Sequence, residues 1–195
     1  MMMQVQHRLL VPVPHISSSS QRPKRFSPPP PVLARINCLY TAKPSHHSNS
    51  MAAPKWAQKT VTLSPHRRGC HLITSKILNE IGSELSEFKC GLAHFFIQHT
   101  SASLTINENY DSDVRDDTET FLNNIVPEGR SAPWKHTLEG PDDMPAHIKS
   151  SMFGCQLTIP ITNGKLNMGT WQGIWLCEHR DHPTPRKVVV TFNGI

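Results

Sequence analysis

The chain has 195 residues and a formal net charge of +5, a length that fits one ordinary domain with an extension. The charge is uneven: residues 1–50 hold six of the 20 basic side chains and no acidic one, so residues 51–195 carry 14 basic and 15 acidic side chains. This near-neutral balance excludes a generic basic surface for nucleic acid, and no stretch has the length of a membrane-spanning helix.

Residues 1–50 are rich in serine, proline and arginine and contain no acid. This composition is typical of an organellar transit peptide, and the four prolines from Pro28 to Pro31 cannot continue a helix or a central strand. An untargeted disordered tail has the same composition. We predict a chloroplast or plastid transit peptide that is removed near residue 50, with a cytosolic form starting at Met51 as the alternative.

The five cysteines show no CxxC spacing, which argues against a zinc knuckle. One lies within residues 1–50, and each of the others lies in or beside an apolar run. We therefore predict buried free thiols in a reducing compartment rather than a disulfide framework. The five are Cys38, Cys70, Cys90, Cys155 and Cys177.

Residues 51–195 are expected to form one domain that opens with a strand and a helix. Threonine and valine in 56–63 favour a strand, and the short apolar run 70–73 is expected to pair near it. Apolar residues three and four positions apart then predict a helix over 74–88, with Thr74 as its N-cap.

The middle of the domain is predicted to hold a long strand or a strand pair, followed by a second helix. Residues 92–107 alternate so that Phe95, Ile97 and His99 share one face. A helix is expected over 111–125, where acidic side chains suit the N-terminus and one apolar stripe is buried. The stripe consists of Val114, Phe121, Leu122 and Ile125.

The last part of the domain is predicted to be mainly β. After a loop over 126–143, Pro145 fits the first turn of a short helix that runs to Met152 and ends at Gly154. Strands are expected over 155–162, 165–179 and 186–194, with a hairpin turn at Asn163-Gly164. The whole pattern predicts an α+β fold, with mostly antiparallel sheets packed with about three helices in a single compact domain.

His99 is the first candidate for chemistry. It follows an apolar strand and precedes the small, mostly hydroxyl-bearing run "TSAS", where a strand end can open into a polar site. The alternative is a core histidine that is hydrogen-bonded to the backbone.

A second candidate is the stretch "PWKHTLEGPDDMPAHIKSS", which contains two histidines and two aspartates. His136 from the loop and His147 from the helix could converge on one ion, and three imidazole ligands leave a coordination position for water or substrate. Their spacing is not a tight metal signature, so a polar surface loop is the alternative. Asp142 and Asp143 also fit a helix N-terminus.

Two further stretches carry candidate residues. The run "NENYDSDVRDD", which includes Glu108, offers carboxylates somewhat like a calcium loop but lacks the glycine and final glutamate of an EF-hand, so solvated acids at a helix start are the alternative. In "GTWQGIWLCEHRDHPTPRK", the amide of Gln172 and the charges of Arg186 and Lys187 could bind a phosphate. The alternative there is a core strand, with Trp171 and Trp175 on one face and the charges at its rim.

Four stretches together resemble the YjbQ-like family, also named secondary thiamine-phosphate synthase: "HTSASLTINEN", "AHIKSSMFG", "NGKLNMGTWQGIWLCE" and "RKVVVTFNG". The match runs from about Trp56 to Gly194, so the YjbQ-like domain is assigned to residues 51–195, and residues 1–50 lie outside it. The resemblance implies a compact α+β subunit that assembles as a homotrimer, with sites near the subunit boundaries.

The resemblance also implies roles for particular residues. His99, His136 and His147 are expected as ligands of a divalent metal ion, either zinc or magnesium, and no organic cofactor is indicated. The expected catalytic residues are His99, His147, Glu178 and Arg186. The expected substrate-binding residues are Glu108, Gln172, Arg186 and Lys187.

The activity implied by the resemblance is the coupling of hydroxymethylpyrimidine diphosphate with thiazole phosphate, which releases pyrophosphate. The leaving diphosphate needs positive charge, and Arg186, Lys187 and a divalent ion could supply it. A metal-dependent hydrolase or other enzyme of phosphorylated metabolites is one alternative. A non-catalytic, trimeric metal- or ligand-binding protein is the other.

Overall fold

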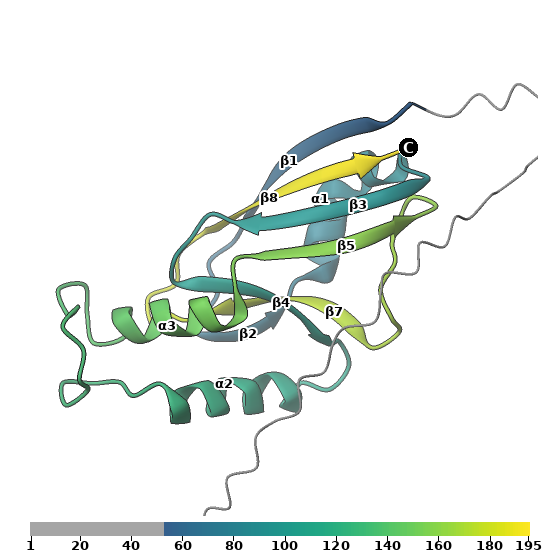
Figure 1. Cartoon of the computed structure of the whole chain (residues 1–195). Helices are drawn as coiled ribbons and strands as arrows, with labels where there is room; N and C mark the ends of the chain where they lie inside the picture. The colour runs from purple at the N-terminus through teal and green to yellow at the C-terminus, as the bar shows by residue number, and fades with distance from the viewer. Residues whose placement is uncertain (1–52) are drawn as a thin grey trace, which may run out of the picture. The chain divides into compact units, whose positions relative to one another are not determined.

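Two antiparallel sheets form the framework of residues 53–195, which are the residues that this computed structural model describes (Figure 1). The five-stranded sheet has the order β1 (Lys55–Leu63), β8 (Arg186–Gly194), β3 (Cys90–Ile97), β5 (Gln156–Thr162) and β6 (Lys165–Leu166). The three-stranded sheet has the order β2 (Gly69–Leu72), β7 (Gln172–Glu178) and β4 (Ala102–Glu108). The predictions for residues 1–50 lie outside the described residues.

The main core lies between these two sheets and is closed by α1 (Thr74–Ser86). Alternation along β3 and β8 turns every second side chain inward, so that Phe95, Ile97, Val188 and Val190 are fully buried. The apolar stripe of α1 packs on the same core. Each large side chain buried there stabilises the fold by about 1.5–3 kcal/mol relative to exposure.

Two more helices, α2 (Asp113–Ile125) and α3 (Asp143–Phe153), lie on the far side of the three-stranded sheet (Figure 1). Trp175 and Cys177 of β7 project towards them and form a second, smaller cluster with Cys70. Val114 of α2 and Phe153 of α3 pack against this cluster. Strand β7 is therefore covered on both faces, and all its residues after Gln172 are buried.

The chain crosses from one sheet to the other at two neighbouring places. Strand β3 ends at Ile97 and β4 starts at Ala102 in the other sheet, while β7 ends at Glu178 and β8 starts at Arg186. Backbone hydrogen bonds join the two crossings, from Gln98 N to Lys187 O and from His179 N to Ser101 O. We call this region the crossover end of the three-stranded sheet.

The structure confirms the α+β fold with antiparallel sheets and three helices. Several local predictions fit as well: Asn163 and Gly164 both have positive φ in the β5–β6 turn, and Gly164 would meet Ser86 if it carried a side chain. Gly154 ends α3 with φ 91°. Within the described residues, no helix is long and apolar enough to cross a membrane.

Two predictions about the first elements are wrong. The run 70–73 does not pair near the first strand, because β1 is bonded along its length to β8, and β2 instead pairs with β7 in the other sheet. Thr74 does not cap α1; its hydroxyl accepts a hydrogen bond from the backbone N–H of Ile174 and ties the helix start to β7.

Three expectations of burial hold only in part. Only Leu122 of the α2 stripe is fully buried, and Phe121 and Ile125 face outward, because α2 covers the edge of a small sheet rather than a deep core. Trp171 is 61% exposed because it precedes β7, whereas Trp175 within the strand is fully buried. Cys90 is exposed and Cys155 is half-buried, so only Cys70 and Cys177 fit the predicted burial.

Candidate metal and active site

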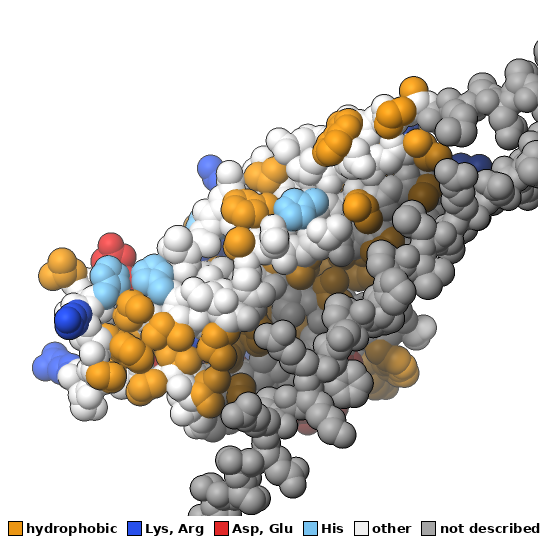
Figure 2. Space-filling model, viewed as in Figure 1, with side chains coloured by type: hydrophobic (Ala, Val, Ile, Leu, Met, Phe, Trp, Pro, Cys, Tyr) orange, Lys and Arg blue, Asp and Glu red, His pale blue; other side chains and the backbone are white. Residues whose placement is uncertain are grey.

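Three side chains at the start of α3 form a group that we call the histidine–aspartate cluster: His136, Asp143 and His147. One ligand atom from each lies within 4.8 Å of the others. Nε2 of His136 is 2.6 Å from Oδ2 of Asp143, and Nε2 of His147 is 3.4 Å from the same oxygen. Imidazole rings are visible at the surface over this end of α3 in Figure 2.

Local sequence explains how the three groups meet. Asp143 and His147 are four residues apart on α3, so they lie one above the other on the same helix face. His136 comes from the preceding loop, and its ring centroid is 5.5 Å from that of His147. Asp143 is fully buried while both histidines are accessible, so the carboxylate forms the floor of the cluster and the imidazoles its rim.

Arg180, from the loop after β7, holds both aspartates in place. Its guanidinium bonds Oδ1 of Asp143 and, at 2.8 Å, Oδ2 of Asp142, and it also donates to the carbonyl of Glu139. Asp142 accepts a further bond from the backbone N–H of Asp181. Burial alone would raise the pKa of Asp142, but these two donors outweigh it and lower that pKa. Neither aspartate makes a side-chain cap, and Asp142 is buried rather than solvent-facing.

The orientation of His147 is fixed from the opposite side of the ring. Its Nδ1 lies 3.0 Å from the carbonyl oxygen of Thr100, which can only accept, so Nδ1 carries the proton. In the neutral imidazole, Nε2 then keeps its lone pair and points to Asp143. A carbonyl that fixes the tautomer of a histidine in this way is a common feature of metal sites.

Buried charges beneath α3 fix the helix in its position. Lys149, two residues after His147, is fully buried and donates to Glu128 at 2.9 Å. Glu128 is also held by Arg68, which in turn bonds Glu119 of α2. Burial lowers the pKa of Arg68, but the hydrogen bonds and charge of Glu128 outweigh that effect and raise it. This ion network connects α2, α3 and the loop between them.

Glu178 and Arg186 form a buried ion pair at the crossover end. The guanidinium donates from Nε and one terminal nitrogen to the two carboxylate oxygens, at 2.7 and 2.6 Å. Glu178 also accepts a hydrogen bond from the backbone N–H of Arg180, and Arg186 also donates one to Oγ of Ser101. Because Nε and one terminal nitrogen of Arg186 already donate to Glu178, only the remaining N–H groups of Arg186 could bind a phosphate.

His99 lies beside this ion pair rather than in the histidine–aspartate cluster. Its Nε2 accepts a hydrogen bond from the backbone N–H of Lys187 at 2.9 Å, and its Nδ1 is 3.3 Å from Arg186. Burial, followed by the charge of Arg186, lowers the pKa of His99 although Glu178 opposes this, so the ring is neutral near pH 7. The structure thus brings together only two of the three histidines expected as metal ligands.

A hollow of about 840 Å³ connects the two groups of residues. His99, Thr100, His147 and Ser150 line it, together with Phe96, Ile97, Gln98, Ser151, Gly154 and Cys155. Two imidazoles therefore line the hollow: that of His147 from the histidine–aspartate cluster and that of His99 from the crossover end. A smaller cavity of about 260 Å³ is lined by His136 together with Trp134 and Arg130.

Two expected substrate-binding residues lie elsewhere. Glu108 and Gln172 face each other across β4 and β7, whereas Glu178 pairs with Ala102 at the other end of the same strands. Six residues of strand separate the two ends, which corresponds to roughly 20 Å. Gln172 accepts a bond from Gly169 N, and Glu108 lines a shallow pocket with Trp171.

The cluster has donor atoms that suit a transition-metal ion. Two imidazole nitrogens and one carboxylate oxygen are a ligand set of zinc, and three protein ligands leave a position for water or substrate. Zinc at about 2.0–2.1 Å from each donor needs the donors roughly 3.3 Å apart, so His136 and Asp143 must move slightly apart while the 4.8 Å span closes. The three residues therefore fit an ion.

Reasoning from the sequence left Asp143 out of the expected ligands and missed Arg180 altogether. The signal for Asp143 was its position four residues before His147 at a helix start. Arg180 had no such signal, because its role depends on the approach of the loop after β7 to the start of α3.

Comparison with known proteins gives one consistent result. Residues 59–195 match the model of the family described as UPF0047 protein YjbQ-like. The chain is 50% identical over 139 residues to the UPF0047 protein YjbQ of Escherichia coli O157:H7, which covers 71% of this chain and 99% of that protein. It is 42% identical over 147 residues to a UPF0047 protein of Synechocystis, covering 75% of this chain and 97% of the relative.

Solved structures agree. A YbjQ-like protein of unknown function from Sulfolobus solfataricus matches with a TM-score of 0.63 and 26% identity, covering 73% of this chain and all of that one. An uncharacterized conserved protein of the yjbq/upf0047 family from Clostridium acetobutylicum matches with a TM-score of 0.58 and 38% identity, covering 67% and 97% of the two chains.

Proposed function

Because the chain belongs to the YjbQ-like UPF0047 family, we propose that it is a metal-dependent enzyme of small phosphorylated metabolites. The supporting observation is the histidine–aspartate cluster, which gathers His136, Asp143 and His147 at the edge of a hollow large enough for such a metabolite. A divalent ion there would supply positive charge to an oxygen of a phosphate or diphosphate group.

The residues of the chain have separate tasks in this proposal. His136 and His147 bind the ion through Nε2, and Thr100 keeps the proton of His147 on Nδ1. Arg180 neutralises the buried Asp143 and fixes its position. His99, on the wall of the same hollow, is neutral and is available as a proton acceptor or donor if the contact with Lys187 N–H is exchanged for substrate.

The reaction we propose first is the coupling of hydroxymethylpyrimidine diphosphate with thiazole phosphate. Its leaving group is a diphosphate, which needs positive charge, and the remaining N–H groups of Arg186 contact Ser101 and His99, which lines the hollow. The ion pair with Glu178 fixes the orientation of Arg186, so Glu178 is a positioning residue in this scheme. Lys187 is exposed, and its backbone N–H bonds His99 on the wall of the hollow.

A hydrolase is the second candidate, and it is favoured by the coordination position that two imidazoles and one carboxylate leave for water. The two reactions differ in their products. Incubation with both precursors gives thiamine phosphate and pyrophosphate in the first case. Release of inorganic phosphate from single phosphorylated metabolites, without coupling, supports the second.

The deciding experiment compares histidine variants of protein purified without an affinity tag. We expect wild-type protein to hold about one zinc, manganese or magnesium ion per subunit, and His136→Ala and His147→Ala to lose both the ion and the coupling activity. His94→Ala is the matched control, because His94 lies on β3 away from the cluster and bonds only Thr158. Wild-type protein that binds none of these ions in titration calorimetry contradicts the proposal.

The resemblance also leads us to propose a homotrimer. Exposed apolar side chains support a subunit contact: Phe121 and Ile125 of α2, Met152 of α3 and Trp171 before β7. Apolar atoms spread over the surface of α2 and α3 in Figure 2. Light scattering of the purified protein tests the assembly, and a monomeric mass at micromolar concentration contradicts it.

A further inference from the structure

Cys70 and Cys177 are a second reactive arrangement, separate from the histidine–aspartate cluster. They lie directly opposite each other on the antiparallel strands β2 and β7. Their sulfur atoms are 3.4 Å apart, although 107 positions separate them in the sequence. Facing residues of antiparallel strands have Cα atoms roughly 4.5–5.5 Å apart, which is within the range that a disulfide spans.

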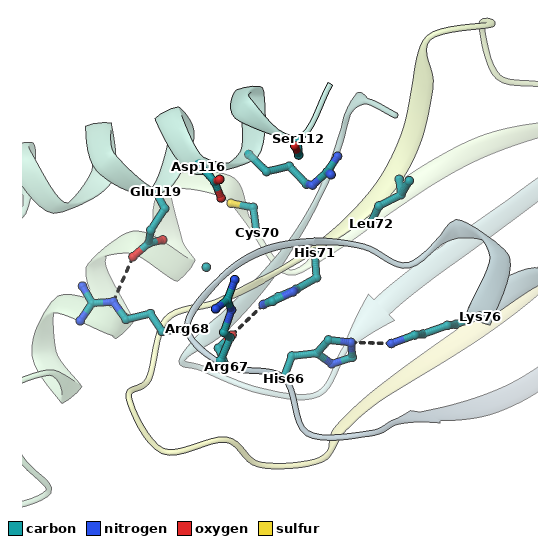
Figure 3. Close-up of a pocket in the computed structure, with 12 residues that line it drawn as sticks. His66, Arg67, Arg68, Cys70, His71, Leu72, Lys76, Ser112, Asp116 and Glu119 are labelled. Atoms are coloured by element: carbon teal, nitrogen blue, oxygen red, sulfur yellow. Dashed lines mark hydrogen bonds and ion pairs between the residues drawn. The ribbon is translucent and has the colours of Figure 1, made fainter. Parts of the chain in front are cut away.

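The two sulfurs differ in their access to solvent. Cys177 is completely buried, whereas Cys70 is 9% exposed and lines a pocket of about 590 Å³ between β2 and α2. Figure 3 shows the Cys70 side chain beside Asp116, with the basic residues Arg67 and Arg68 in the same view. A small oxidant that enters this pocket meets Cys70 first.

Charged side chains line the pocket that Cys70 faces. Arg67, Arg68, Lys76 and Arg115 contribute four positive charges to its lining, against the two carboxylates of Asp116 and Glu119. Arg68 is neutralised by its ion pairs, but the remaining cations still outnumber Asp116. At Cys177, the hydrogen bond with Cys70 and burial raise the pKa of the thiol.

We propose that Cys70 and Cys177 form a reversible disulfide when the protein meets a hydroperoxide, with Cys70 as the attacked thiol and Cys177 as the resolving thiol. In the first step, the sulfur of Cys70 takes the terminal oxygen of the peroxide and becomes a sulfenic acid, and the peroxide is reduced to an alcohol or water. In the second, the sulfur of Cys177 displaces that hydroxyl group, its proton leaves with it as water, and the S–S bond forms.

Oxidation at this place would change the neighbourhood of the candidate active site. Cys177 immediately precedes Glu178, and Gly69, before Cys70, pairs with Glu178 across the strands. The bond would also close a loop that includes α1, α2 and α3 and would fix the edge strand β2 to β7. We therefore expect oxidised protein to unfold at a higher temperature than reduced protein.

The test uses the full chain with Cys38, Cys90 and Cys155 each replaced by serine, so that only the proposed pair can react. Folded protein is treated with hydrogen peroxide, alkylated and digested with trypsin. We expect peptide 69–76 linked to peptide 166–180, with a mass two hydrogens below their sum, and separation of the two after dithiothreitol.

Two variants identify the order of events. In the same background, Cys177→Ala should leave Cys70 as a sulfenic acid that dimedone traps, and Cys70→Ala should leave Cys177 unmodified for lack of access. Unchanged circular dichroism verifies folding of each variant. Complete alkylation of both thiols after peroxide treatment, or links only between different chains, overturns the proposal; both observations can be made without either variant.

Discussion

The two ends of the three-stranded sheet are built from the same strands, yet they differ in chemistry. At the crossover end, β7 and the loop after it carry buried charge: Glu178 pairs with Arg186, and Arg180 bonds Asp143. At the far end, Glu108 and Gln172 lie among exposed groups, beside the open ring of Trp171. A buried charge needs a fixed partner, whereas a solvated one does not. Rigid positioning of polar groups is thus confined to one end.

This difference bears on how residues of both ends could serve one site. Within a single subunit, roughly 20 Å of strand separates Glu108 from the crossover end. A neighbouring subunit in the proposed trimer could bring its own far end to the hollow. The crossover end would then supply its residues when a single subunit folds, whereas the far end would supply its residues only when subunits assemble.

The largest effect is expected from removing one partner of the buried ion pair. Glu178→Ala leaves the Arg186 guanidinium buried without its carboxylate, which should lower the free energy of unfolding by about 3–5 kcal/mol. Glu108→Ala at the far end should cost less than about 1 kcal/mol, because solvent replaces its contacts. Urea denaturation of both variants measures the contrast, and equal losses would remove the distinction between the two ends.

The second prediction concerns Arg180 and the histidine–aspartate cluster. Arg180→Ala removes the group that positions and neutralises Asp143, so the affinity for a divalent ion should fall by about 10–100-fold. Gln172→Ala should leave that affinity unchanged, since Gln172 lies at the far end. Titration calorimetry with zinc provides the measurement. Arg180→Lys should restore part of the affinity, which a nonspecific loss of structure would not allow.

Acid should destabilise the crossover end through His179. Burial, followed by the charges of Lys149, Arg68 and Arg186, lowers the pKa of His179 from 6.5 to about 3. Between these values the unfolded chain binds a proton that the folded chain does not, so stability falls as the pH drops below 6.5 and this loss is complete near pH 3. The slope is about 1.4 kcal/mol per pH unit within the window.

Hydrogen exchange as a function of pH locates that effect. Amides around Ser103, which bonds Nε2 of His179, should lose protection before amides near Glu108 on the same strand. His179→Gln should flatten the pH dependence of the unfolding temperature between pH 6.5 and 4. If His179→Gln leaves the pH dependence of the unfolding temperature unchanged, groups other than His179 cause the loss of stability in acid.

The smallest effect is expected at the far end itself. Trp171 is exposed and makes an edge contact with Tyr110, with ring centroids 5.6 Å apart. Trp171→Ala should therefore reduce the free energy of unfolding of a single subunit by less than about 1.5 kcal/mol. If the far end contributes to assembly, the same variant should weaken the trimer, which sedimentation at several concentrations detects. If neither the free energy of unfolding nor the stability of the trimer changes, the far end contributes to neither folding nor assembly.

The sequence predicted the fold because its signals are local. Alternation in 155–162 and the Asn-Gly turn specify β5 and its hairpin, and the stripe in 74–88 specifies α1. The choice of sheet for each strand is not local. The segment 92–107 was predicted to be one long strand or a strand pair, and it splits at His99 into two strands that enter different sheets. Likewise, β2 carries no feature that selects β7 over β1 as its partner.

The candidate site was predictable in its residue types but not in its grouping. His136 and His147 were expected to meet and do so, whereas His99 was expected to join them and instead bonds Lys187 N–H. The Glu178–Arg186 pair shows the same limit. Each was expected in the site. Only the crossing of the chain from β7 to β8 brings the two side chains together as an ion pair in which each neutralises the other.

The pairing of β1 with β8 has a consequence for the synthesis of this protein. Lys55–Leu63 at the start of the described residues bonds along its whole length to Arg186–Gly194 at their end. A ribosome releases the first strand long before the last, so this ladder at the edge of the larger sheet cannot form until residues 186–194 have been synthesised. A nascent chain must therefore remain incompletely folded until β8 has been synthesised, which leaves an interval for chaperones to bind it.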